Sequence, residues 1–226
     1  VENKIQIERL IDYFQVIPAL YIADGHHRAA SAARVQKIRE EANPNHSGYE
    51  PYNYFLSVIF PHDEMQILDY NRVVKDLNGF TEEQFHESIN ENFDIVPIPH
   101  PPSPIPKNNY SMHINGKWYQ LEAKTHVKSD DPVEGLEASI LQKYLLTPIL
   151  DIDDPRTNKR IDFVGGIRGM VELERRCEID CQVAFALPPV SIEQLLSVAD
   201  SGQVMPPKST WFEPKLRSGM VVRLLD

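Results

Sequence analysis

The chain has few cysteines, no long apolar run and a shortage of positive charge. Cys177 and Cys181 are the two cysteines among 226 residues, too few for the disulfide framework of a small secreted protein. No apolar run approaches the roughly 20 residues that cross a bilayer. The formal net charge is -10, which argues against nucleic acid as the main partner. We therefore expect a cytoplasmic protein without a membrane segment.

The rest of the composition is that of an ordinary globular protein. The sequence is 42% hydrophobic and 25% charged, and its length allows one sizeable core or two modest ones. The first residue is Val1 rather than Met, and a helical pattern starts almost at once. We therefore expect the sequence to be a fragment of a longer protein.

Helix and strand patterns mix along the chain without strict alternation. A short apolar run at residues 19–23 predicts a strand buried on both faces. Asn115 and Gly116 separate two strand patterns and are typical of a type I′ hairpin turn. The other predicted strands are 52–60, 67–75, 94–98, 182–187 and 220–225, and the predicted helices are 5–17, 28–41, 81–92, 133–146, 167–176 and 191–199. These patterns predict an α+β fold with a mixed sheet.

A proline-rich stretch divides the sequence. Residues 100–107 read HPPSPIPK, a composition typical of an extended connector. We therefore predict two portions, residues 1–99 and a C-terminal α+β portion of residues 108–226 that contains the hairpin and a PPKST loop.

A cluster of charged and imidazole side chains follows the first predicted strand, in the sequence YIADGHHRAA at residues 21–30. Gly25 lets the backbone turn sharply and lets a ligand approach the main chain. The next helix begins near His26, so its unpaired N–H groups and positive dipole end face the turn. Arg28 can add a bidentate contact, and His26 and His27 can donate from their rings. The stretch predicts a phosphate site.

Asp24 does not fit a plain anion site, because a carboxylate repels phosphate. It fits if it holds Mg²⁺ or accepts a proton from a hydroxyl nucleophile. The alternatives are structural: an aspartate before a helix is usually a cap, and a histidine in a first turn is usually solvated. A metal held by His26 and His27 is the weaker reading, because adjacent side chains diverge at a helix start.

The ADGHHR stretch resembles the phosphate-binding turn of the superfamily that holds ParB-type partition proteins, sulfiredoxin and the free-serine kinases. The whole chain resembles the family called domain of unknown function 1015, through YIADGHHR, DFVGG at 162–166, and MPPKSTWFEPKLRSGMVVRLL at 205–225. The resemblance implies a ParB/sulfiredoxin-like nucleotide-binding core within residues 1–99, truncated at its amino end. It also implies that Gly25, His26, His27 and Arg28 cradle the phosphates and that Asp24 stands where the serine kinases have a catalytic acid.

Two further groups are candidates for substrate binding. The PPKSTWFEPKLRSG loop gathers cations and hydroxyls that could clamp a phosphate over the Asp24 turn; they are Lys208, Ser209, Thr210, Lys215 and Arg217. The alternative is a solvated turn anchored in the core by Trp211 and Phe212. Arg72, on a predicted strand, could bind a substrate carboxylate or could be an ordinary strand arginine.

Together these features predict a nucleotide-dependent phosphotransferase similar to the free-serine kinases. It would use ADP or ATP with Mg²⁺ and a small polar metabolite, with Asp24 as base or metal ligand and His26 as the second catalytic residue. The serine kinases also use a glutamate well upstream of the motif, and we place no such partner before Asp24. The alternatives are therefore a nucleotide-binding switch of ParB type and a structural protein.

Overall fold

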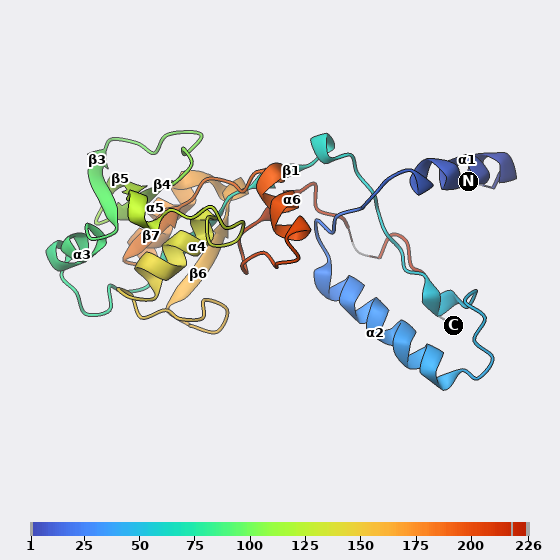
Figure 1. The fold of residues 1–226 in the computed structure, drawn as a ribbon. Coiled ribbons are helices and arrows are strands. Elements are labelled where there is room, and N and C mark those ends of the chain that lie inside the picture. Colours follow the sequence, from blue (N-terminus) through green and yellow to red (C-terminus); the bar gives the residue numbers. More distant parts are fainter. Residues whose placement is uncertain (1, 218, 225–226) are drawn as a thin grey trace. The chain divides into compact units, whose positions relative to one another are not determined.

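The computed structural model describes residues 2–217 and 219–224, and the chain forms two compact units (Figure 1). The first unit combines Val1–Ile59 with Leu216–Asp226, and the second is Phe60–Lys215. No helix among the described residues is both long enough and apolar enough to span a membrane.

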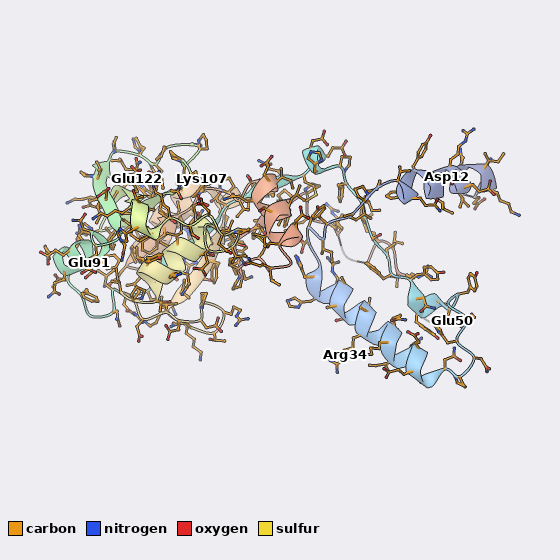
Figure 2. The ribbon with its side chains drawn as sticks, in the orientation of Figure 1. Asp12, Arg34, Glu50, Glu91, Lys107 and Glu122 are labelled. Atoms are coloured by element: carbon orange, nitrogen blue, oxygen red, sulfur yellow. The ribbon has the colours of Figure 1, made fainter. Side chains whose placement is uncertain are left out.

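The first unit consists of helices and extended chain. Helix α1 is Lys4–Gln15, helix α2 is His26–Ala42, and the short helix η1 is Pro51–Asn53. The side chain of Asn3 caps α1 by accepting a hydrogen bond of 2.9 Å from the Ile5 N–H. None of the described residues of this unit is buried. Asp12 and Arg34 stand clear of packed neighbours, whereas side chains crowd around the sheet of the second unit (Figure 2).

The strands predicted for this unit are wrong. Residues 19–23, 54–59 and 220–224 have extended or irregular backbone without ladder partners, and residue 225 lies outside the described residues. Leu20 and Ile22 are 59% and 53% exposed, although we expected this run to be buried. Their composition favours strands, but a strand needs a neighbour to pair with, and the described residues of this unit provide none.

The second unit is built on a six-stranded sheet in the order β3-β5-β4-β7-β2-β6. The strands are β2 Tyr70–Val74, β3 Phe93–Ile98, β4 Asn109–Ile114, β5 Lys117–Ala123, β6 Ile161–Gly165 and β7 Val183–Ala186. A separate ladder pairs β1 Gln66–Leu68 with β8 Trp211–Glu213. The α+β class is confirmed. Every described strand pair is antiparallel, so the sheet is not the mixed sheet that we predicted.

The predicted hairpin is confirmed in its turn and its register. Strands β4 and β5 pair from Asn109 with Glu122 to Ile114 with Lys117. Asn115 and Gly116 have φ angles of 48° and 72°, the left-handed values that a type I′ turn requires at both central positions.

Helices pack on both faces of the sheet, and the buried residues form two apolar clusters and a smaller third one that includes Leu136 and Val198. The helices are α3 Glu82–Ile89, α4 Glu137–Leu141 with its continuation η4 Gln142–Leu146, α5 Gly169–Ile179 and α6 Ile192–Asp200, joined by the short helices η2 His62–Glu64, η3 Thr125–Val127 and η5 Gly166–Arg168. Val74 and Phe85 belong to the largest cluster, whereas Val73 and Leu173 belong to the cluster under α5. Adjacent residues of β2 therefore serve opposite faces.

The proline-rich stretch at 100–107 is a loop inside the second unit. It connects β3 to β4, and β5 pairs with both of these strands. The boundary that we predicted here therefore falls within one compact unit, and the division of the chain lies after Ile59 and before Leu216. Proline content identified the loop correctly but could not reveal that one strand joins the segments on either side of it.

Candidate functional site

The predicted phosphate turn lies where α2 begins. Gly25 is the N-cap residue, with a φ angle of 85°, and no side chain caps the helix. The Gly25 N–H donates to the Asp24 carboxylate at 2.7 Å, and the Ala29 N–H donates to the Gly25 carbonyl at 3.0 Å. Asp24, His26, His27 and Arg28 are all exposed. The turn is thus formed as expected, although the residues before it are not a strand.

The Arg28 side chain folds back over Gly25. A Cβ atom at Gly25 would lie 3.0 Å from Nη2 and 3.1 Å from Nε of Arg28. A side chain at this position would therefore crowd the guanidinium, and it would also be strained by the left-handed backbone. Glycine thus lets a guanidinium lie beside the amino end of a helix, which brings together two positively polarised groups.

The substrate-binding candidates of the second unit lie around β2. Arg72 is buried, and Lys208 Nζ lies 5.4 Å from the centre of the Tyr70 ring and 3.4 Å from its hydroxyl oxygen. Lys215 Nζ lies 5.3 Å from the centre of the Trp211 ring. The Ser209 hydroxyl donates to the Pro206 carbonyl at 2.7 Å, so it stabilises its own loop. Thr210 is half-buried next to it.

A cavity of about 580 Å³ brings Arg72 and the PPKST loop together. Arg72 comes from β2, Ser139 from α4, and Pro206 and Pro207 from the loop. The remaining lining residues are Val133, Glu134, Ala138, Gln142, Lys143, Asp153, Asp154, Pro155 and Arg156. Arg72 and the loop were each candidates from the sequence, but no sequence pattern indicated that they line the same cavity.

The glycines of DFVGG make close contacts that the sequence did not predict. A Cβ atom at Gly166 would lie 2.0 Å from the Asp69 carboxylate, and one at Gly165 would lie 2.5 Å from the Trp211 ring. Burial raises the pKa of Asp69, while a hydrogen bond donated by the Asn71 amide opposes that rise. The two glycines therefore let β6 approach Asp69 and Trp211 closely. A Gly-Gly pair after a strand was the only available signal.

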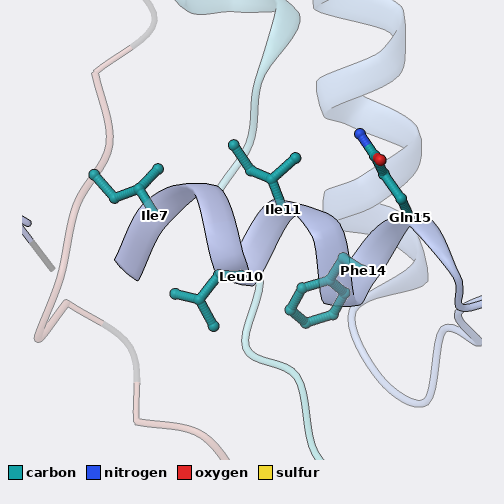
Figure 3. Close-up of a pocket in the computed structure, with 5 residues that line it drawn as sticks. All are labelled: Ile7, Leu10, Ile11, Phe14 and Gln15. Atoms are coloured by element: carbon teal, nitrogen blue, oxygen red, sulfur yellow. The ribbon is translucent and has the colours of Figure 1, made fainter. Parts of the chain in front are cut away.

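An apolar hollow follows one side of α1 in the first unit (Figure 3). Its lining residues all belong to α1 and are Ile7, Leu10, Ile11, Phe14 and Gln15. None of them carries an ionisable group, so the hollow offers surface for packing and no means of catalysis.

A match to a protein family shows which family the chain belongs to. The family described as protein of unknown function, DUF1015, matches residues 1–139, more than half of the sequence. The chain belongs to this family. The match includes the Asp24 turn and Arg72, and the resemblance seen in the sequence is confirmed. No curated protein matches the chain.

Several solved structures are distantly similar to this family member. Free serine kinase in complex with AMP is 14% identical, over 94% of this chain and 81% of that one, with a TM-score of 0.47. A mutant free serine kinase in complex with AMP is 13% identical, with a TM-score of 0.42; the alignment covers 66% of this chain and 55% of that one. A conserved hypothetical protein from Pyrococcus furiosus is 12% identical, over 84% and 68%, with a TM-score of 0.44. Likeness at this level carries no conclusion about activity.

Proposed function

We propose that the chain binds the phosphates of ADP or ATP at Asp24–Arg28 and transfers a phosphoryl group to the hydroxyl of a small polar metabolite. One observation carries the proposal: the Arg28 guanidinium lies over Gly25 at a helix end that no side chain caps. The choice of ADP or ATP rests on the resemblance of the Asp-Gly-His-His-Arg sequence to the turn of the free-serine kinases.

The main-chain groups of the turn suit a phosphate. The first N–H groups of α2 have no partner inside the helix, so they can donate to phosphate oxygens. Arg28 can add two charge-assisted hydrogen bonds. No acidic residue occupies the first turn of α2, and Asp24 stands before it with its carboxylate held by the Gly25 N–H.

In the proposed reaction the acceptor hydroxyl oxygen attacks the terminal phosphorus and forms a new phosphorus–oxygen bond. Asp24 takes the hydroxyl proton as the oxygen attacks. The bond to the leaving phosphate oxygen breaks, and its electron pair stays on the nucleotide, which departs as AMP or ADP. His26 and Arg28 donate hydrogen bonds to the oxygens on which charge develops.

Asp24 is also the proposed Mg²⁺ ligand. The described residues contain no cluster of three or more histidines, cysteines, aspartates or glutamates that could enclose a metal ion. Mg²⁺ is commonly held by one or two carboxylates together with phosphate oxygens and water, so a single Asp24 carboxylate fits that arrangement. When bound, the ion would neutralise phosphate charge.

The roles proposed for Lys208, Ser209, Thr210 and Lys215 differ in how well their contacts support them. The ammonium groups of Lys208 and Lys215 lie against the aromatic rings of Tyr70 and Trp211. The Ser209 hydroxyl proton is engaged by the Pro206 carbonyl, so this residue is the weakest candidate. A clamp formed by these side chains over the Asp24 turn stays a prediction.

Calorimetry and product analysis test the proposal. Arg28→Met should weaken ADP binding about 10- to 100-fold, because it removes a charge-assisted contact worth about 1.5–3 kcal/mol. Arg34→Met, the same change farther along α2, is the matched control and should bind ADP normally. Asp24→Asn should bind the nucleotide but release no AMP or ADP with L-serine or related alcohols.

The two assays have distinct negative outcomes. Saturable nucleotide binding without turnover for any alcohol would remove the phosphotransfer step and favour a ParB-like nucleotide switch. Absence of ADP and ATP binding by the chain would overturn the whole proposal and leave a structural role.

A further inference from the structure

A buried arginine in the second unit has no acidic partner among the residues that the structure describes. Arg72 lies on β2, between β6 and β7, and is 5% exposed. Its guanidinium donates to the Tyr70 carbonyl and lies 5.6 Å from the centre of the Phe163 ring. Among the described residues no carboxylate pairs with it, so the fold encloses a positive charge that it does not neutralise.

Such an arrangement is costly for a purely structural residue. Burying a charge without a counter-ion is unfavourable, and buried arginines are normally paired. Burial lowers the pKa of Arg72 to about 10, a value at which the guanidinium still carries its charge near neutral pH. A buried cation without a counter-ion on β2, next to the edge strand β6, is therefore expected to bind a ligand.

The cavity beside Arg72 is large enough for a small metabolite. Its volume is about 580 Å³, within the range of small-molecule sites. Two other cations in its lining already have acidic partners, because Lys143 pairs with Glu134 and Arg156 pairs with Asp154. Arg72 is thus the lining cation that no described carboxylate neutralises.

We propose that this cavity binds a small monocarboxylic acid, with the carboxylate on the Arg72 guanidinium. One guanidinium matches a single negative charge, and its planar N–H groups suit bidentate binding of a carboxylate. The apolar side chains of Ala138, Pro206 and Pro207 line the same cavity and can contact the rest of the ligand. The inference adds a cavity and a ligand class to the carboxylate role that the sequence suggested for Arg72. It does not depend on the proposed nucleotide site, since the cavity belongs to the second unit.

The first experiment titrates the full chain with L-lactate, neutral lactamide and inorganic phosphate, without nucleotide. Thermal unfolding and the Arg72 Nε–H signal in NMR spectra are the readouts. We expect lactate to raise the unfolding midpoint saturably and to shift the Arg72 signal, and lactamide to do neither. Equal effects of lactate and lactamide, or a stronger effect of phosphate at Arg72, would overturn the proposal.

The second experiment compares two arginine variants of equal charge change. Arg72→Met should weaken the lactate response at least 10-fold and leave the unfolding midpoint unchanged or higher, because the ligand-free fold loses an unneutralised charge. Arg175→Met is the control: Arg175 is exposed on α5 and pairs with Glu172, and its lactate response should be unchanged.

Lactate binding that persists in Arg72→Met would contradict the proposal. If Arg72→Met does not fold, the ligand comparison on the unmodified chain decides alone. A lactate-specific shift of the Arg72 signal then supports the site, and its absence rejects it.

Discussion

Helices with similar amphipathic sequences are buried in the second unit and exposed in the first. Helix α3 of the second unit buries Phe85 and Ile89 completely, whereas α1 of the first unit leaves Leu10 and Phe14 45% and 42% exposed. Both helices have a side-chain N-cap, so the difference does not arise from local helix signals. It arises because the second unit has a sheet to cover and the first has none among its described residues.

The two units are stabilised in different ways. In the second unit, helices and strands pack against one another and enclose contiguous apolar clusters, which stabilise the fold. In the first unit, helices and the Asp24 turn follow from local propensity, capping and glycine geometry. Apolar side chains exposed in such number normally mark surface that another partner covers.

Separating the two units should have the largest effect. We expect residues 60–215 to unfold cooperatively when expressed alone, because this segment contains the whole six-stranded sheet and its buried clusters. A peptide of residues 1–59 should show no cooperative unfolding transition. Circular dichroism during urea titration measures both, and a cooperative transition in the shorter peptide would contradict the distinction.

Truncating one phenylalanine in each unit should have very different costs in the intact chain. Phe185→Ala should lower the free energy of unfolding by about 3–5 kcal/mol, because Phe185 is fully buried on β7. Phe14→Ala, on the exposed face of α1, should change it by less than about 0.5 kcal/mol. Urea denaturation measures both values, and similar costs at the two positions would show that α1 is packed.

A glycine substitution tests the close packing of the second unit. Gly166→Ala should cost about 1–3 kcal/mol, because the added methyl group would meet the Asp69 carboxylate. In the double variant Asp69→Gly with Gly166→Ala, the added cost of the alanine should largely vanish. Equal costs of Gly166→Ala in the two backgrounds would show that Asp69 is not the obstacle.

Two carboxyl groups, Glu50 and Asp69, should make folding stability depend on pH in opposite directions. Hydrogen bonds, first from the Ser47 N–H, lower the pKa of Glu50 in the first unit to about 2. The stability that Glu50 contributes is present above its ordinary pKa of 4.5 and is lost as pH falls toward 2. Burial raises the pKa of Asp69 from 3.8, so the folded state favours its neutral form and stability is lost as pH rises from 3.8 through the raised value.

The variants Glu50→Gln and Asp69→Asn remove these two contributions separately. Compared with the unmodified chain, Asp69→Asn should become relatively more stable as pH rises, whereas Glu50→Gln should become relatively less stable. Urea denaturation between about pH 3 and pH 7 measures the difference for Asp69→Asn. The chemical shifts of the Ser47 and Gly48 amides, which donate to the Glu50 carboxylate, report the local stability that Glu50 contributes over the same pH range. Slopes of the same sign would refute the assignment.

The features that the sequence predicted correctly depend on residues close together in the chain. The Asn115-Gly116 turn, the start of the helix predicted at 81–92 and the glycine turn before α2 are all confirmed. The predicted strand at 19–23 is wrong because strand formation depends on a partner far along the chain, which no local pattern reveals.

Long-range contacts explain the other misses. The contact of Gly166 with Asp69 joins the residue after β6 to the residue before β2, and the cavity joins Arg72 to Pro206. Neither contact could be predicted from the spacing of residues along the sequence, although DFVGG, Arg72 and the PPKST loop each stood out separately. The candidate turn at Asp24 was visible in the sequence because it is local, whereas the surroundings of Arg72 required the fold.

The most direct measurement is a titration of the ¹⁵N-labelled chain with ADP and Mg²⁺, in which amide chemical shifts are followed residue by residue. We predict saturable shifts at Gly25, His26 and His27, which disappear in Arg28→Met and persist in Arg34→Met. Unshifted amides in this turn at saturating ADP, or shifts unaffected by Arg28→Met, would contradict a phosphate site at the amino end of α2.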